Sequence, residues 1–231
     1  MRIAVISDVH ANLPALIAVL RKIDALAPEL TLCAGDVVGY NPFPNETVEE
    51  IRKRQIACVM GNHDWACLSG DTGWFNPSAA AALAWTRERL TGENMAWIAR
   101  LPKRIEKNVG GLRVLMVHGS PDDELFEYVF REDAERRAHA WLKETDVLVL
   151  GHTHVPMGLK VEIDGEEKMI VNPGAVGQPR DGDPRASLAV LDTEELGCEW
   201  VRLAYDARSV RDAIYAHELP RELGDRLLAG F

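Results

Sequence analysis

The sequence lacks the features that mark membrane-spanning and secreted proteins. No apolar run approaches the roughly 20 residues that a membrane-spanning helix needs. The apolar stretch Arg2–Ile6 is too short for a signal peptide, and a charged motif follows it directly. The chain has only four cysteines, and none of them forms a CxxC pair. We therefore expect reduced thiols in a cytoplasmic protein, with neither disulfides nor a cysteine-ligated zinc ion.

Positive charge is also scarce. Lys and Arg together number 26 against 36 Asp and Glu, which gives a formal net charge of −10. Proteins that bind long nucleic acids contact the phosphates through Lys and Arg, so this balance argues against such a partner. Bound cations can instead compensate an excess of carboxylates. The 231 residues are 47% hydrophobic and show no linker or repeat, which predicts a single domain over residues 1–231.

Apolar runs alternate with amphipathic stretches in the first 60 residues. Strands are expected at Arg2–Ile6, Glu29–Ala34 and Gln55–Met60. Helices are expected from the Asn12-Leu13-Pro14 start to about Ala27, and over Glu46–Arg54. This βαβαβ order favours parallel strands with helices outside the sheet.

The rest of the chain predicts a second set of elements. Two helices are expected within Pro77–Arg100, another over Arg131–Leu142, and one or two in a helical tail over residues 205–231, broken at Pro220. Strands are expected at Arg104–Lys107, Leu112–Val117, Val147–Leu150, Met157–Ile163, Glu167–Val171, Ser187–Leu191 and Glu199–Leu203. The simplest arrangement is one domain with two sheets.

Metal-binding side chains gather where five of these strands end. In open α/β sheets, ligands bind beyond the carboxyl ends of the strands, so residues at these ends should share one cleft. Any one such motif occurs often by chance, but five in the same structural context do not. The residues concerned are Asp8, His10, Asp36, Asn62, His63, His118, His152 and His154.

The motifs DxH, GDxxG, GNHD, a strand-end HG and GHTH follow one another in that order, from Asp8 to His154. This series resembles the calcineurin-like metallophosphoesterases. The segment Asn172–Arg180 is similar to the NPGS stretch of small bacterial phosphodiesterases in that family. The resemblance implies an α/β fold, a four-layer α/β/β/α sandwich of two mixed sheets flanked by helices.

The resemblance also implies roles for the matched residues. One metal ion would be held by Asp8, His10 and His154, and a second by Asn62, His118 and His152. Asp36 would bridge the two ions, and His63 would be the general acid rather than a ligand. A hydroxide shared by the two metals would attack phosphorus, and His63 would protonate the departing alkoxide.

The donor types constrain the cofactor. Carboxylate and amide oxygens suit hard divalent ions, whereas imidazoles shift the preference toward transition metals. We expect two divalent transition metal ions, with Mn or Fe favoured and Zn, Co or Ni as alternatives. So many histidines disfavour Mg²⁺ and Ca²⁺.

Residues 35–40 read GDVVGY and depart from the protein-phosphatase branch, whose longer GDxVDRG block contains a second Asp and an Arg. The departure argues against a protein phosphatase and removes that branch's phosphate-binding arginine. Arg180 is the best replacement, because its fork of donors suits phosphate, although a surface role explains it equally well. Tyr40 and Asn41 are further candidates for substrate contact, with turn chemistry as the alternative for Asn41.

Three aromatic residues and one acidic residue allow two interpretations each. Trp65 and the Trp74-Phe75 pair follow His63 and could stack on a nucleobase, but core packing is favoured for them. Asp64 either orients His63 or caps a helix N-terminus.

The sequence therefore predicts a binuclear metal-dependent phosphoester hydrolase. A phosphodiesterase for small phosphodiesters or nucleotides, such as dinucleoside polyphosphates or cyclic nucleotides, is the leading expectation. A phosphomonoesterase is the nearest alternative, and a non-catalytic scaffold of the same fold is a weaker one. The expected partner is a small phosphorylated molecule, with no membrane and no long nucleic acid. The tail permits either internal packing or a homo-oligomer contact.

Overall fold

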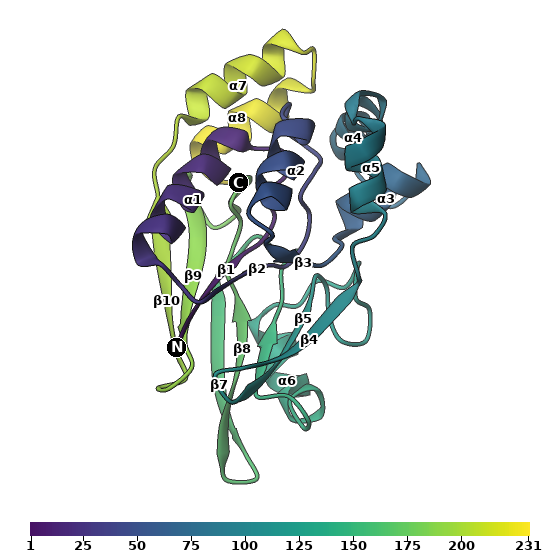
Figure 1. Ribbon diagram of the computed structural model, residues 1–231. Helices are drawn as coiled ribbons and strands as arrows, with labels where there is room; N and C mark the ends of the chain where they lie inside the picture. The colour runs from purple at the N-terminus through teal and green to yellow at the C-terminus, as the bar shows by residue number, and fades with distance from the viewer.

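Two five-stranded mixed sheets form the centre of the computed structural model, which describes residues 1–231 (Figure 1). The first sheet has the order β10-β9-β1-β2-β3. Strands β1, β2 and β3 are parallel, and β9 and β10 continue the sheet in antiparallel pairings. The bounds are β1 Arg2–Ile6, β2 Leu30–Cys33, β3 Ala57–Cys58, β9 Ala186–Asp192 and β10 Gly197–Leu203.

The second sheet has the order β4-β5-β6-β8-β7. Its centre, β5-β6-β8, is parallel, and both edge strands pair in the antiparallel sense. The bounds are β4 Arg104–Val109, β5 Leu112–Val117, β6 Val147–Val149, β7 Met157–Ile163 and β8 Glu166–Asn172.

Alternation along β1 divides its side chains between two cores. Ile3 and Val5 belong to a cluster that includes Val114, Met116 and other residues of the second sheet, so this core lies between the sheets. Ala4 and Ile6 point the other way, toward helices on the outer face. Because both faces of β1 are covered, the strand is apolar at nearly every position.

Helices cover the outer faces of both sheets. Helix α1 packs on β9 and β10, and α6 packs on β7 on the opposite side of the molecule. The predicted four-layer α/β/β/α sandwich is therefore confirmed. The helices are α1 Leu13–Leu26, α2 Pro44–Lys53, α3 Asn62–Ser69, α4 Pro77–Arg89, α5 Gly92–Ile98, α6 Arg131–Trp141, α7 Ala207–Ala216 and α8 Arg221–Ala229.

Three local predictions differ from the structure. The third strand is only Ala57–Cys58, because the chain pairs with β2 for two residues before it turns into the site. Helix α3 was expected only under the capping interpretation of Asp64, and it begins at Asn62, within the GNHD motif itself. Helix α2 begins at Pro44, two residues before the predicted start at Glu46, as suits the fixed φ of proline at a helix start.

The tail is helical, as expected, and it packs on the rest of the chain. Val210, Ile214, Leu223 and Leu227 form a cluster with Tyr40 and with residues of α4. In Figure 1 the tail helices α7 and α8 lie beside α1, on the same side of the sheets.

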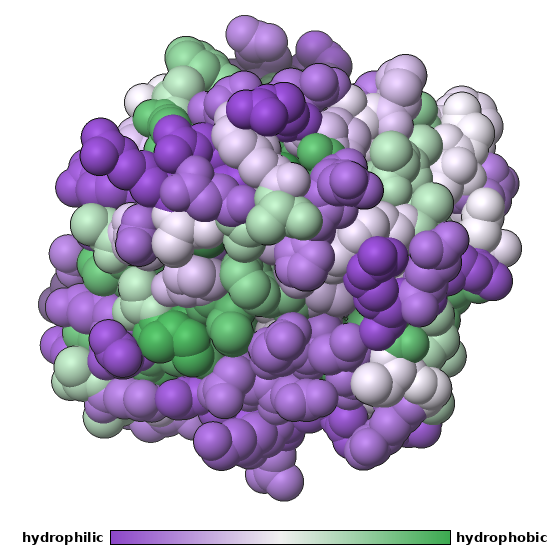
Figure 2. Space-filling model, turned by 90° about the horizontal axis from the view of Figure 1, so that it is seen from above, coloured by the Kyte–Doolittle hydropathy of each residue, from purple (hydrophilic) through white to green (hydrophobic).

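The view from above shows a mostly hydrophilic surface broken by small apolar patches (Figure 2). None of the helices combines the length and the apolar character that crossing a bilayer requires.

Candidate metal centre

The predicted ligands meet beyond the carboxyl ends of the strands. They come from the segments after β1, β2, β5 and β6, and from the start of α3 after β3. All seven are buried, with at most 5% of the residue surface exposed. They are Asp8, His10, Asp36, Asn62, His118, His152 and His154.

Two groups of side chains could each hold one cation. Asp8, His10, Asp36 and His154 form the first, with ligand atoms all within 4.8 Å of one another. His154 Nε2 lies 3.3 Å from Asp8 Oδ1 and 3.1 Å from His10 Nε2. These are the three residues expected to hold one metal, together with the expected bridging carboxylate.

Asp36, His118 and His152 form the second group. His118 Nε2 lies 3.2 Å from His152 Nδ1 and 3.0 Å from Asn62 Oδ1. Asp36 belongs to both groups: its Oδ2 atom lies 3.5 Å from His10 Nε2 and 3.4 Å from His118 Nε2. The shared carboxylate is thus in a position to bridge two cations.

Backbone carbonyls fix which nitrogen of each imidazole faces the centre. His10 Nδ1 pairs with the carbonyl oxygen of Val38, and His118 Nδ1 with that of Ala34. His154 Nδ1 and His152 Nε2 make the same kind of contact, with Gln178 and Phe126. In a neutral imidazole that donates its N–H to a carbonyl, the other ring nitrogen is a lone pair, the form in which histidine binds metals.

The two carboxylates are oriented in the same way. Asp8 Oδ2 accepts the backbone N–H of His152, and Asp36 Oδ1 accepts that of His63. Their other oxygens, Asp8 Oδ1 and Asp36 Oδ2, are buried and accept no hydrogen bond. A buried carboxylate oxygen without a partner is costly. Facing imidazole lone pairs and free carboxylate oxygens are together the donor set that a transition metal satisfies.

The backbone around the centre is strained. Five of the seven predicted ligands have positive φ: Asp8 (53°), His10 (48°), Asp36 (53°), His152 (68°) and His154 (61°). This left-handed conformation is uncommon outside glycine, and it clusters at functional sites. These turns direct the side chains of Asp8 and His10, and those of His152 and His154, toward the same centre.

Without a metal, charge and burial shift the pKa values strongly. Burial opposes the charge on His118, but the nearby Asp36 carboxylate outweighs it and raises the pKa of His118 to about 10. Burial raises the pKa of Asp8 to about 7, with repulsion from Asp36 adding to it. Burial lowers the pKa of His10 and of His154 well below the usual range.

We expect metal binding to release protons near neutral pH. His118 carries a proton in the metal-free protein, because its pKa is raised to about 10, and a metal needs the lone pair that this proton occupies. The affinity for the metal should therefore rise with pH up to the pKa of His118, about 10. Calorimetric titration with Mn²⁺ in two buffers of different ionisation enthalpy measures the release. A binding heat that does not depend on the buffer would contradict this proton release. The control is His139→Gln, at an exposed helical position, which should behave as the wild type does.

Asp64 holds the loop that carries the bridging carboxylate. Its carboxylate accepts the backbone N–H groups of Val37, Val38 and Gly61, at 3.0–3.2 Å. Asp64 is the third residue of α3, so it closes a capping box rather than standing at the N-cap. Burial raises its pKa to about 7 despite these donors. Asp64 makes no hydrogen bond to the His63 ring.

Asp64→Ala should destabilise the fold markedly. The change leaves three buried N–H groups without an acceptor, at about 1–3 kcal/mol each. We expect the free energy of unfolding in urea to fall by about 3 kcal/mol or more, with chelator present so that metal loss does not contribute. Asp71→Ala, which removes an exposed carboxylate that accepts the backbone N–H of Gly73, is the matched control. Equal stabilities for the two variants would disprove this role.

His63 lies beside both ligand groups without joining either. Its ring is 4.7 Å from that of His10, 4.4 Å from Tyr40 and 4.8 Å from Phe75, measured between centroids. Its Nδ1 is buried without a partner, and a Cβ on Gly39 would come within 2.5 Å of that atom. Only glycine at position 39, with φ +97°, leaves room for this ring.

The three predicted substrate-contact residues lie at different depths. Arg180 is half-buried and donates from Nη2 to the Tyr40 hydroxyl (3.2 Å) and to Gln178 Oε1 (3.3 Å). Tyr40 packs its ring on His10 and His63. Asn41 is buried and donates to the carbonyl of His10, and its Oδ1 atom has no hydrogen-bond partner. The turn interpretation accounts for the donated bond, and substrate contact by Asn41 stays a prediction.

The structure adds residues that the sequence did not reveal. A pocket of about 220 Å³ adjoins the centre, and its walls include Tyr40, His63 and His152. Phe126 and Tyr128 reach it from the long segment between β5 and α6, where no motif marked them. Trp74 also lines it and is 82% exposed, so the expectation of core packing was wrong for this residue. Trp65 is half-buried, packs against the core and contacts Phe126 edge to face, at 5.4 Å.

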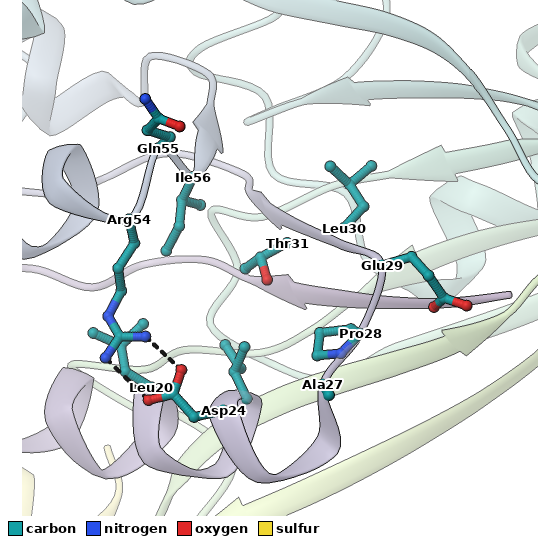
Figure 3. Close-up of a pocket in the computed structure, with 11 residues that line it drawn as sticks. Leu20, Asp24, Ala27, Pro28, Glu29, Leu30, Thr31, Arg54, Gln55 and Ile56 are labelled. Atoms are coloured by element: carbon teal, nitrogen blue, oxygen red, sulfur yellow. Dashed lines mark hydrogen bonds and ion pairs between the residues drawn. The ribbon is translucent and has the colours of Figure 1, made fainter.

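A larger cavity, of about 530 Å³, lies elsewhere and has different chemistry (Figure 3). It borders the start of β2 at Leu30 and Thr31, whereas the predicted ligand of β2 follows the end of that strand. Arg54 and Asp24 form an ion pair across it, 2.6 Å between Nη1 and Oδ1. No histidine lines this cavity, so its size does not make it the functional site.

Comparisons with known proteins agree with this geometry. The model of the calcineurin-like phosphoesterase superfamily domain matches residues 1–196. An uncharacterized protein of Methanocaldococcus jannaschii is 37% identical over 241 aligned residues, covering 99% of this chain and 98% of its own. A metallophosphoesterase from Sphaerobacter thermophilus is 37% identical and superposes with a TM-score of 0.83. The match covers 100% of this chain and 99% of that chain. A hypothetical protein from Pyrococcus horikoshii shares the fold at 24% identity, with a TM-score of 0.89 and coverage of 100% and 98%. The chain thus belongs to the calcineurin-like phosphoesterase superfamily.

Proposed function

We propose that this protein is a binuclear metal-dependent phosphodiesterase that acts on small phosphodiesters or nucleotides. The observation that carries the proposal is the pair of ligand groups that share Asp36. Asp8, His10 and His154 would hold one ion with Asp36, and Asn62, His118 and His152 the other. Mn or Fe is the favoured metal, with Zn, Co or Ni as alternatives.

A pair of divalent cations supplies polarisation of the phosphoryl oxygens and a water molecule acidified for attack. The protein's own groups do the rest. Asp36 and the histidines set the geometry, held in turn by Ala34, Val38 and other backbone carbonyls. Arg180, half-buried beside Tyr40, would pair with a non-bridging phosphoryl oxygen. His63 would donate the proton that the leaving alkoxide requires.

Two features favour a small diester over a phosphoprotein. The segment GDVVGY lacks the second Asp and the Arg of the protein-phosphatase block. The pocket beside His63 has a volume of about 220 Å³, which suits one substituent of an ester rather than a folded partner. The net charge of −10 disfavours long polyanions as substrates. A cytoplasmic location fits the four scattered cysteines and belongs to the same proposal.

Elemental analysis and a substrate screen test the proposal together. About two transition metal ions per chain and Mn²⁺-dependent turnover of bis-p-nitrophenyl phosphate are expected. Turnover of p-nitrophenyl phosphate alone would keep the centre and make the protein a phosphomonoesterase. Absence of both metal and turnover after reconstitution would leave the non-catalytic scaffold as the remaining explanation.

A further inference from the structure

The pocket beside His63 has an unusual concentration of aromatic side chains. Five of its ten lining residues are Tyr, Trp or Phe, and none is Asp, Glu, Lys or Arg. Two of these rings are exposed, Trp74 by 82% and Tyr128 by 48%. Large rings left in water next to a cavity mark a surface that binds an apolar group. The five are Tyr40, Trp74, Phe75, Phe126 and Tyr128.

These rings are continuous with the candidate metal centre. Tyr128 stacks on His152, with centroids 3.8 Å apart and planes inclined by 26°. Phe75, the neighbour of Trp74 in the chain, contacts the ring of His63 edge to face at 4.8 Å. The same pocket is therefore bounded by a predicted metal ligand on one side and by the predicted general acid on the other.

The position of the pocket and its lack of charged side chains together define which chemical group would fit in it. A group next to His63 is the alcohol that leaves, because the general acid must reach the leaving oxygen. A pocket without charged side chains suits a neutral group, and flat rings stack on aromatic side chains whatever their edges carry. A second phosphate would find no cation here.

We propose that this pocket binds a nucleobase of the leaving nucleoside, stacked on the exposed ring of Trp74 and bordered by Tyr128. The inference rests on the proposed hydrolysis of phosphoesters at the adjoining centre, and it names the leaving group. Stacking on Trp74 makes the enzyme select nucleoside esters over esters of aliphatic alcohols.

Calorimetric titration of the Mn²⁺-loaded protein with two ligands tests this inference. Adenosine 5′-monophosphate and ribose 5-phosphate share the phosphate and the sugar, so the ratio of their affinities isolates the base. We expect adenosine 5′-monophosphate to bind at least about fivefold more tightly, the lower end of one base–aromatic stacking contact. Equal affinities would overturn the proposal. Phosphate release in the same samples is measured to correct for turnover.

The variant Trp74→Leu separates stacking from other contributions. Its side chain is exposed, so folding should be unaffected. We expect it to lose affinity for adenosine 5′-monophosphate about fivefold or more and to leave ribose 5-phosphate unchanged. Phe231→Leu removes another exposed ring, outside this pocket, and should change neither. A loss for both ligands, or for neither, would overturn the assignment of Trp74.

Two further outcomes distinguish the competing explanations. If Trp74→Leu instead dissolves a dimer in sedimentation experiments, without changing the affinity ratio, then a second copy of the chain covers these rings and the proposal is wrong. Hydrolysis of bis-p-nitrophenyl phosphate is assayed separately. Turnover of that diester without a preference for the base rejects only the nucleobase pocket, whereas a preference without any turnover rejects only the catalytic function.

Discussion

Asp36→Asn is expected to weaken both metals together. Asp36 Oδ2 lies between the two ligand groups, 3.5 Å from His10 Nε2 and 3.4 Å from His118 Nε2. Its other oxygen accepts the backbone N–H of His63. An asparagine that keeps this bond turns its NH₂ group, a donor, toward the cations. We therefore expect affinity for both ions to fall by at least about 100-fold, the upper end of what outer-shell changes cost.

Metal content after dialysis against a weak chelator measures this effect. Asp36→Asn should lose both ions and, with them, hydrolysis. His154→Gln and His152→Gln are the matched variants, since each residue belongs to only one group. We expect each of these two variants to keep about one ion tightly bound and to lose the other ion more readily. If Asp36→Asn kept two tightly bound ions and full activity, Asp36 would not be the residue that bridges the two ions.

The convergence of the ligands was predictable because it follows from topology. In a parallel sheet the carboxyl ends of successive strands meet at one edge, so short motifs far apart in sequence become neighbours. Asp8 and Asp36 follow the parallel neighbours β1 and β2 of the first sheet, and His118 and His152 follow the parallel neighbours β5 and β6 of the second. Continuous apolar runs located these ends without knowledge of the sheet order.

Element boundaries near the site were less predictable, and the reason is tertiary. Helix α3 begins on Asn62, a predicted ligand, and carries no clear apolar stripe in NHDWACLS. Its start is stabilised instead by Asp64, which binds the N–H groups of Gly61 and of the loop after β2. Such bonds depend on contacts between distant segments, which local sequence patterns do not encode.

The outer wall of the site could not be predicted from the sequence. Phe126 and Tyr128 lie in a segment of irregular structure between β5 and α6, where no periodicity indicates which rings face inward.

His63 presents the sharpest test of the proposed chemistry, because its environment opposes its role. Burial lowers its pKa to about 4 in the metal-free protein, which would leave the imidazole neutral at pH 7. A general acid must carry a proton. The approaching phosphate anion acts in the opposite direction, since a negative charge beside an imidazole raises its pKa. His63 should therefore become protonated in the substrate complex rather than in the free enzyme.

His63→Ala should consequently show an effect that depends on the leaving group. An alkoxide needs a proton to depart, so we expect kcat for an alkyl phosphodiester to fall by about 10²–10⁴-fold. Nitrophenolate leaves without a proton, so hydrolysis of bis-p-nitrophenyl phosphate should fall far less. For the wild type, kcat on the alkyl ester should decrease as pH rises through the pKa of bound His63, and this limb should vanish in the variant. His139→Ala, at an exposed position of α6, should change neither reaction. Equal losses on both esters would mean that His63 shapes the site without donating a proton, and its packing against His10, Tyr40 and Phe75 would then be its whole contribution.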